Sequence, residues 1–356
     1  LWSLLSNVFM IIILIYLTRI IRLILKRNLS SFVLSEVLVL ILFSISILMG
    51  NAKIDILLNF LFWSACVGIP LGITYYSIED KQLFIKYSRK FSILIIVAGV
   101  IGFLFMNEEN SYIMSIAYFM LLPIITLINI QFKENTFRLL LLLVISISFI
   151  LIYGARGPII GIIYILMINF YKLLTKLTIK SFLLFALIIM ILVSALVFWN
   201  QMIWAIVDFL DSINVYSRTL TRLAYGGILD SSGRDFLFQY YIDLIIERPM
   251  FGWGIAGGWF SRALGPHNAI LELNLAFGVV IGGVLSFMLI LSFVLPFINR
   301  KLLYNDIYTS FAAVNLPLIV SAGDIWAKYN LFIYVFIILD IINRKYRKSS
   351  IIIKNK

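Results

Sequence analysis

Apolar runs of about 15 residues or more recur along this chain, and they restrict its fold more than any other feature. A helix of about 20 residues crosses the roughly 30 Å apolar core of a bilayer, so each run is long enough, or nearly so, to span a membrane. Lipid offers the backbone no hydrogen-bond partners, which favours helices as the spanning structure. Eleven runs qualify, at about 1–18, 31–49, 56–78, 91–106, 111–130, 139–153, 158–171, 181–199, 269–298, 307–323 and 326–342.

The fold class that follows is an all-α polytopic integral membrane protein with about 11 transmembrane helices and one large, partly helical loop. The chain is 62% hydrophobic over 356 residues, a share too high for a soluble domain of this size. Its net charge of +12 would suggest nucleic acid in a soluble protein, but the positive-inside rule predicts the same excess here. We therefore expect no nucleic-acid partner. The single cysteine, Cys66, permits neither an intrachain disulfide nor a cysteine metal cluster.

The basic residues predict the orientation of the chain. If the side that holds Arg19 and Lys26 is cytoplasmic, alternation places 21 of the 29 Lys and Arg residues on that side. The N-terminus then lies outside, and because the chain begins with Leu we expect a twelfth helix in the full-length protein. Three parts follow, namely N-terminal transmembrane helices (1–199), a large external loop (200–266), and C-terminal transmembrane helices with a basic cytoplasmic tail (267–356).

The external loop 200–266 is rich in arginine. Five arginines lie in it: Arg218, Arg222, Arg234, Arg248 and Arg262. The flat guanidinium fork matches phosphate oxygens, and it keeps its charge when partly buried. This pattern indicates an anion-binding surface. The alternative is pairing with carboxylates of the same loop, which are Asp208, Asp211, Asp230, Asp235, Asp243 and Glu247.

Three basic side chains precede or begin predicted helices on the external side. Ser232-Gly-Arg-Asp235 has the form of a capping box, so a helix is predicted from about Gly233 to Glu247 with Arg234 in its first turn. Arg156 follows a glycine break and precedes Pro158, which suits a first helical turn. His267 stands just before the apolar run at 269. Positive helix ends favour anions, so these three ends are predicted to converge on one anion; a lipid-headgroup anchor is the alternative for Arg156.

His267 is the only histidine, so no second imidazole is present to share a metal, and the chain has no Asp-x-Asp pair. We therefore expect neither a metal nor another cofactor. A neutral imidazole at a helix start suits a general base that takes a proton from a hydroxyl, and a structural role is the alternative. Glu272 falls inside the next apolar run, where a charge is costly. It is expected to orient the site or to support Asn268 and Asn274.

At these residues the chain resembles the O-antigen polymerase and ligase superfamily of bacterial membrane glycosyltransferases, the Wzy and WaaL type. Three elements carry the resemblance over about 154–283: Ala155-Arg156-Gly157, Gly233-Arg234 followed by Glu247-Arg-Pro249-x-x-Gly252-x-Gly254, and His267-Asn268-x-x-Leu271-Glu272. It implies an inner-membrane protein with its active site facing the periplasm, and an undecaprenyl-diphosphate-linked oligosaccharide as donor. The matching Arg156 and Arg234 would grip the diphosphate, and His267 would activate the acceptor hydroxyl.

Within that family the sequence favours the polymerase. The ligase branch continues nine residues after His-Asn to Gly-x-x-(Gly, Thr or Tyr), but here Ile281 fills the last place after Gly278. A polymerase acceptor brings a second diphosphate, which Arg218 and Arg222 would bind, with Asn268 and Glu272 also on the substrate. Membrane lipid and a chain-length regulator protein are the further partners expected. A flippase is disfavoured because the external arginines lie at or beyond span ends rather than at mid-membrane depth.

Overall fold

The computed structural model describes most of the chain as helix. The described residues are 29–49, 53–78, 80–104, 114–153, 156–175, 190, 198–212, 216–226, 234–259, 265–320 and 325–354. Within these ranges there is no strand, in agreement with the all-α expectation. The runs expected at 1–18 and, for the most part, at 181–199 lie outside the described residues.

The helices follow the apolar runs of the sequence closely. In chain order they are α2 (Leu29–Leu48), α3 (Ile54–Leu61), the π-helical turn η1 (Phe62–Gly68), α4 (Ile69–Ser77), α5 (Lys81–Leu104), α6 (Met114–Glu134), α7 (Phe137–Tyr153), α8 (Arg156–Leu174), α10 (Trp199–Ser212), α11 (Arg218–Gly226), α12 (Arg234–Glu247), α13 (Ala269–Ile298), α14 (Arg300–Leu303), α15 (Asp306–Asn315), α16 (Pro317–Val320), the short 3-10 turn η3 (Ile325–Ala327) and α17 (Tyr329–Lys354).

The protein is membrane-embedded. In the described part of the chain, five helical stretches are long and apolar enough to cross a bilayer, namely Leu29–Leu48, Ile54–Ser77, Ile116–Glu134, Gly157–Leu174 and Ala269–Ile298. Phe137–Leu151 and Tyr329–Ile342 are shorter apolar helices. These segments coincide with seven of the runs expected to span the membrane.

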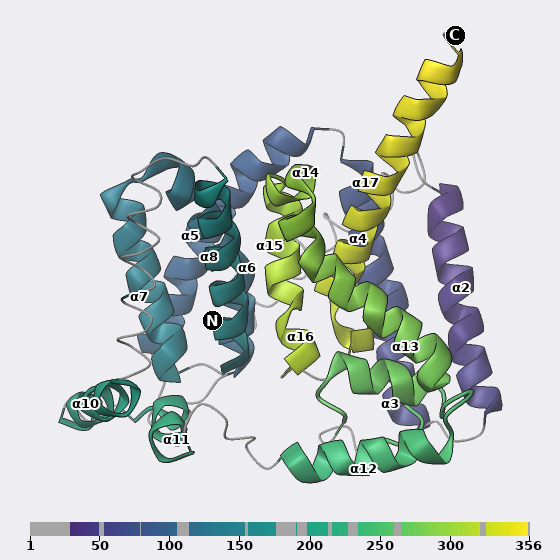
Figure 1. Cartoon of the computed structure of the whole chain (residues 1–356), viewed down its shortest axis with the longest axis horizontal. Coiled ribbons are helices and arrows are strands. Elements are labelled where there is room, and N and C mark those ends of the chain that lie inside the picture. Colours follow the sequence, from purple (N-terminus) through teal and green to yellow (C-terminus); the bar gives the residue numbers. More distant parts are fainter. Residues whose placement is uncertain are drawn as a thin grey trace, which may run out of the picture.

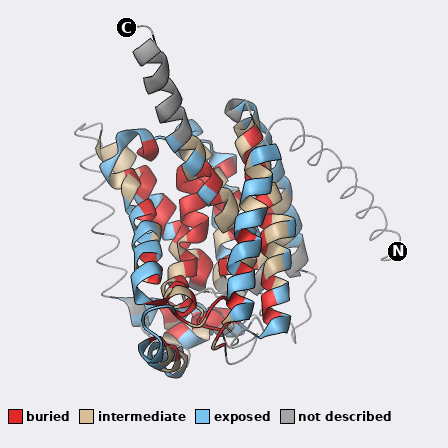
Figure 2. Cartoon of the chain, turned by 90° about the vertical axis from the view of Figure 1, so that its right-hand side faces the viewer, coloured by how far each residue is buried: buried red, intermediate tan, exposed pale blue. Residues whose placement is uncertain are grey.

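Most of the long helices stand side by side, while α10, α11 and α12 lie across one end of the bundle and α14 lies at the other end (Figure 1). Buried residues concentrate where helices face one another, and exposed residues follow the outer faces (Figure 2). In a protein that lies in lipid, exposed apolar side chains are expected on those outer faces. Leu141 and Val144 of α7 are examples, each at least half exposed.

The interior of the bundle combines close helix contacts with a short chain of paired polar side chains. A Cβ on Gly161 of α8 would come within 2.5 Å of the Ala313 carbonyl oxygen, so glycine permits α8 and α15 to approach there. Beside this contact, buried Asn129 donates from Nδ2 to Ser310 Oγ at 2.9 Å and accepts at Oδ1 from Asn169 Nδ2 at 2.8 Å. Their mutual pairing offsets the cost of burying amides in an apolar setting.

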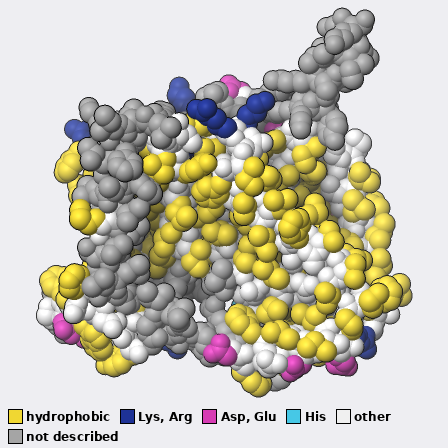
Figure 3. All heavy atoms as spheres, in the orientation of Figure 1, with side chains coloured by type: hydrophobic (Ala, Val, Ile, Leu, Met, Phe, Trp, Pro, Cys, Tyr) yellow, Lys and Arg dark blue, Asp and Glu magenta, His cyan; other side chains and the backbone are white. Residues whose placement is uncertain are grey.

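Charged residues that alternation assigns to one side of the membrane meet at one end of the bundle. Arg89 of α5 pairs with Glu134 of α6 at 2.6 Å, and Asp306 of α15 pairs with both Lys133 of α6 and Lys172 of α8. Lys and Arg side chains gather along this edge, and hydrophobic side chains cover the face between the two ends (Figure 3). This end is called the basic end below. The assignment of these residues to a common side is thereby supported.

Helix α13 differs from the single span expected at 269–298. Gly278 has φ 75° and ψ 173°, a conformation that interrupts the helix and divides it into residues 269–277 and 279–298. The two halves turn back on each other, because Gly282 packs against the backbone of Leu273 and Asn274, and Asn274 Nδ2 donates to Ser286 Oγ at 3.2 Å. The first half, called the half-helix below, has nine residues and is too short to cross a bilayer.

Candidate functional site

Three of the arginines singled out in the sequence are the first residues of their helices. Arg156 begins α8, Arg218 begins α11 and Arg234 begins α12. The helix starts predicted for Arg156 and Arg234 are therefore confirmed, whereas the side chains of all three arginines, and the whole of Arg262, lie outside the described part of the structure.

The start of α8 lies at the end of the bundle opposite the basic end, since Lys172 near the other terminus of α8 pairs with Asp306. The start of α11 lies at that same end. Ser217 caps α11 by accepting from Leu220 N at 3.2 Å, and its hydroxyl donates to the carbonyl of Leu151 near the end of α7 at 3.5 Å. Helix α12 lies across this end as well (Figure 1). All three arginine-headed helices thus begin at one end of the molecule, called the site end below.

His267 precedes the half-helix in a conformation uncommon for a residue with a side chain. Its φ is 50°, in the left-handed region, and it is partly buried. Asn268 follows as the N-cap, with Oδ1 accepting from Ile270 N at 2.9 Å and from Leu271 N at 3.2 Å. The predicted helix start is confirmed, and the cap fixes where the imidazole leaves the backbone. The substrate-binding role expected of Asn268 remains a prediction.

Glu272 is only 2% exposed and binds the protein's own backbone. Its Oε2 accepts from Ile325 N at 3.0 Å, which ties the half-helix to η3. Ala269 and Leu273 on the same half-helix pack with Leu318 of α16. The sequence placed Glu272 in a membrane span, but the break at Gly278 places it in the half-helix, close to the site. Through this contact Glu272 supports the half-helix, while the roles expected of it in orienting the site, supporting Asn268 and Asn274 and binding substrate remain predictions.

The loop after α12 closes the far end of the half-helix. Trp253 N donates to Leu275 O at 2.7 Å and Gly254 N donates to Ala276 O at 3.0 Å, so two carbonyls at the end of a helix are satisfied by this loop. Val279 N in turn donates to Pro249 O at 2.7 Å. The Pro-x-x-Gly-x-Gly segment thus has a definite structural role, which is to hold the break in α13.

The same loop is fixed to other elements by further hydrogen bonds and by a cation–π contact. Ile255 N donates to Ser46 Oγ of α2 at 2.9 Å, and Trp253 Nε1 donates to Leu244 O of α12 at 2.8 Å. The Arg248 guanidinium lies 4.0 Å from the centre of the Trp253 ring. Arg248 is therefore a cation–π partner, a role that neither the phosphate-binding nor the carboxylate-pairing interpretation included.

Helix α16 lies between the half-helix and α8. It contacts both α8 and α13, and its partner on α13 is the half-helix, through Leu318. The sequence did not predict α16, η3 or the break at Gly278 as parts of the site. One signal was present, because a 30-residue apolar run is about 45 Å long as a helix at 1.5 Å per residue, well beyond a bilayer core.

A large apolar cavity lies beside the half-helix. It has a volume of about 790 Å³ and is lined by α2, the loop after α12, both halves of α13, η3 and α17. Leu273 and Ala276 of the half-helix face it together with Ile281, Trp326 and Phe332. The volume lies within the roughly 300–1,000 Å³ range of ligand pockets, and the lining suits a hydrocarbon chain rather than a sugar.

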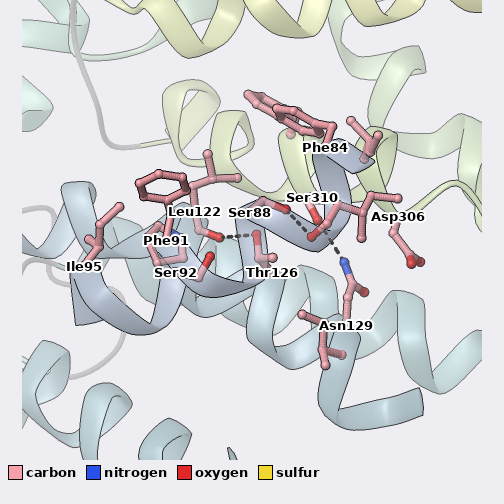
Figure 4. Close-up of a pocket in the computed structure, with 15 residues that line it drawn as sticks. Phe84, Ser88, Phe91, Ser92, Ile95, Leu122, Thr126, Asn129, Asp306 and Ser310 are labelled. Carbon is pink, nitrogen blue, oxygen red and sulfur yellow. Dashed lines mark hydrogen bonds between the residues drawn. The ribbon is translucent and has the colours of Figure 1, made fainter. Parts of the chain in front are cut away.

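A second, smaller cavity of about 170 Å³ lies toward the basic end, between α5, α6 and α15 (Figure 4). Three of its polar side chains already have partners. Ser88 and Thr126 donate to carbonyl oxygens of their own helices, and Asn129 donates to Ser310. The cavity contains no arginine from the site end and is not part of the candidate site.

The described part of the chain contains no group of three or more His, Cys, Asp or Glu side chains arranged to hold a metal ion. Comparison of the chain with protein-family models, with curated proteins and with solved structures gives no match.

Proposed function

We propose that this protein is a membrane glycosyltransferase that moves a glycan from undecaprenyl diphosphate to a sugar hydroxyl, and that it acts as a polymerase of lipid-linked repeat units. The observation that carries the proposal is the placement of His267 at the start of a half-helix that borders an apolar cavity of about 790 Å³. A donor with a hydrocarbon tail and a polar glycan needs such a pairing of an apolar cavity with a polar, titratable group.

In the proposed reaction, the acceptor hydroxyl oxygen attacks the anomeric carbon of the donor sugar and the bond from that carbon to the diphosphate oxygen breaks. His267 takes the hydroxyl proton, and the undecaprenyl diphosphate leaves as an anion. Arg156 and Arg234, each at the start of a helix at the site end, stabilise the charge that develops on the leaving group. No oxidant, nucleotide or metal enters this balance.

The proposal places the active site on the periplasmic side of a bacterial inner membrane. Arg218 and Arg222, at the first and fifth positions of α11, would bind the diphosphate of the acceptor. Asn268 and Glu272 hold the half-helix that presents His267. A chain-length regulator protein would be a further partner of such a polymerase.

The test uses purified protein in vesicles with undecaprenyl-diphosphate repeat units as the only substrate. A ladder of longer chains is expected, and a metal chelator is expected to leave it unchanged. His267→Asn should abolish the ladder, since asparagine tolerates the left-handed backbone at this position and cannot act as a base near pH 7. If repeat units alone give no extension while added lipid A-core accepts one glycan, the protein is a ligase. Movement of intact donor across the membrane without transfer would identify a flippase.

The cavity has its own test. Ile281 lines it and is 53% exposed, whereas Val284 on the same helix is 57% exposed and is not among the residues that line it. Ile281→Trp should raise the KM for undecaprenyl donors, with a smaller effect on donors that have a short polyprenyl tail. Val284→Trp should leave both values unchanged. Equal effects of the two substitutions would remove the cavity from the donor site.

A further inference from the structure

Helix α10 has three distinct sides, and one of them is apolar but covered by no described residue. Ile203, Val207 and Leu210, at helical spacing, are buried. A neighbouring stripe, called the outer stripe below, consists of Met202, Ile206 and Phe209, which are 47%, 41% and 63% exposed. A helix that only packed against the rest of the protein would need the buried stripe alone and no second apolar side.

The buried stripe is satisfied by α11. Leu220 and Leu223 of α11 form one cluster with the three buried residues of α10, and Trp204 meets Tyr225 edge-on with ring centroids 4.9 Å apart. The two helices are therefore a small packed unit. The outer stripe of α10 plays no part in this packing.

The α10–α11 unit lies at the end of the apolar part of α7. The N-cap of α11, Ser217, donates to Leu151 O, so α11 begins where the apolar part of α7 ends. Helix α7 carries exposed apolar residues along its length, including Leu140 and Val144, and α11, which contacts the end of α7, joins it to α10 (Figure 1). The unit of α10 and α11 is thus at the end of the surface by which α7 faces lipid.

We propose that α10 is an in-plane membrane anchor, with its outer stripe inserted into the lipid of the leaflet at the site end. The polar side of the helix, which bears Gln201, Asp208 and Ser212 at helical spacing, then faces water. Helix α10 carries no lysine or arginine, so apolar insertion holds it rather than attraction to anionic headgroups. This inference is independent of the glycan-transfer proposal.

Helix α12 shows that not every helix at this end has such a stripe. Its exposed apolar residues, such as Phe236 and Ile246, are interspersed with exposed Asp235, Asp243 and Glu247. An acidic side chain among the apolar ones opposes insertion into lipid. The outer stripe of α10 contains no charged residue. Because nothing in it opposes insertion, we take lipid as its partner.

The test places a single nitroxide-labelled cysteine at Phe209 or at Asp208, in a Cys66→Ser background, with the full chain in phosphatidylcholine vesicles. These neighbouring residues are on different sides of α10. At Phe209 the label should collide severalfold more with oxygen dissolved in lipid than with a water-soluble nickel chelate, and at Asp208 the order should be reversed. The result at Phe209 should not change when phosphatidylglycerol is added.

Two outcomes of the labelling experiment overturn the anchor. Preferential collision with the nickel chelate at Phe209 would place the outer stripe in water, and protection from both reagents would mean that protein covers it. A second measurement is amide exchange of α10 in the same vesicles. Met202→Asp with Phe209→Asp should speed exchange in α10 severalfold without affecting α8, whereas the matched pair Gln201→Asp with Ser212→Asp should not. Equal rates in the two variants would also contradict the proposal.

Discussion

Gly278 is the residue on which the shape of the site depends most directly. Its φ of 75° is strained for any residue with a Cβ, and a Cβ there would lie 2.4 Å from the Met250 carbonyl oxygen. We expect Gly278→Ala to destabilise the protein by about 2–4 kcal/mol, combining backbone strain with displacement of the loop after α12. Thermal unfolding in detergent measures the change. Gly283→Ala is the control, because its Cβ would come no closer than 3.9 Å to Asn274, and an equal loss there would contradict the argument.

The arginines at helix starts give a prediction about activity. Arg234→Lys keeps the charge but loses the planar fork, and Arg156→Ala loses both. If each binds diphosphate, each substitution should reduce transfer about 10- to 100-fold, as expected for the loss of hydrogen bonds between charged groups. Arg248→Ala is the control, since Arg248 is exposed and stacks on Trp253. Rates of ladder formation measure the three variants, and equal mild effects would reduce Arg156 and Arg234 to surface charges.

At the scale of single residues, the sequence predicts features that depend only on residues nearby in the chain. The helix starts near Arg234 and His267 were readable from residues close in sequence, a capping box in the first case and the beginning of an apolar run in the second. The pairing of Glu272 with Ile325 N was not readable, because it joins residues 53 positions apart. The same holds for Ser46 and Ile255, whose hydrogen bond joins α2 to the loop after α12.

At the scale of elements, the half-helix depends on its N-cap. Asn268→Ala removes the acceptor of two backbone N–H groups and should cost about 0.5–2 kcal/mol, whereas Asn268→Asp keeps an acceptor and should cost less. Amide exchange within residues 269–277 should quicken in the first variant only. Unchanged exchange in both variants would mean that packing on α16, rather than the cap, holds the half-helix.

The apolar runs predicted where helices form, but they did not predict whether each run forms one unbroken helix. The length of the apolar run 269–298 exceeds a bilayer core and so signals a break, but its continuous apolar character does not show where the break falls. The position of the break is determined by contacts with residues outside the run, which the run itself does not contain. Trp253 and Gly254 satisfy the carbonyls that a break exposes, and both come from a loop outside the run.

At the scale of the whole molecule, the orientation is testable with two cysteines. Ser212 at the end of α10 and Thr136 between α6 and α7 are both exposed, and they lie on opposite sides if the charge asymmetry sets the topology. In a Cys66→Ser background, Ser212→Cys should react with a membrane-impermeant thiol reagent in spheroplasts, and Thr136→Cys only after lysis. The reverse pattern would invert the orientation and place His267 on the cytoplasmic side.

The two ends of the molecule are held together in different ways, and this affects how the protein can diverge. At the basic end, Asp306 joins three helices through Lys133 and Lys172, so a length change in any of them displaces the other two. At the site end, α10 and α11 form a small unit with its own cluster, attached to α7 through Ser217. Chains related to this one should therefore differ more in the sequence and length of α10 and α11 than in those of α6, α8 and α15, because changes in α10 and α11 do not require the bundle to repack.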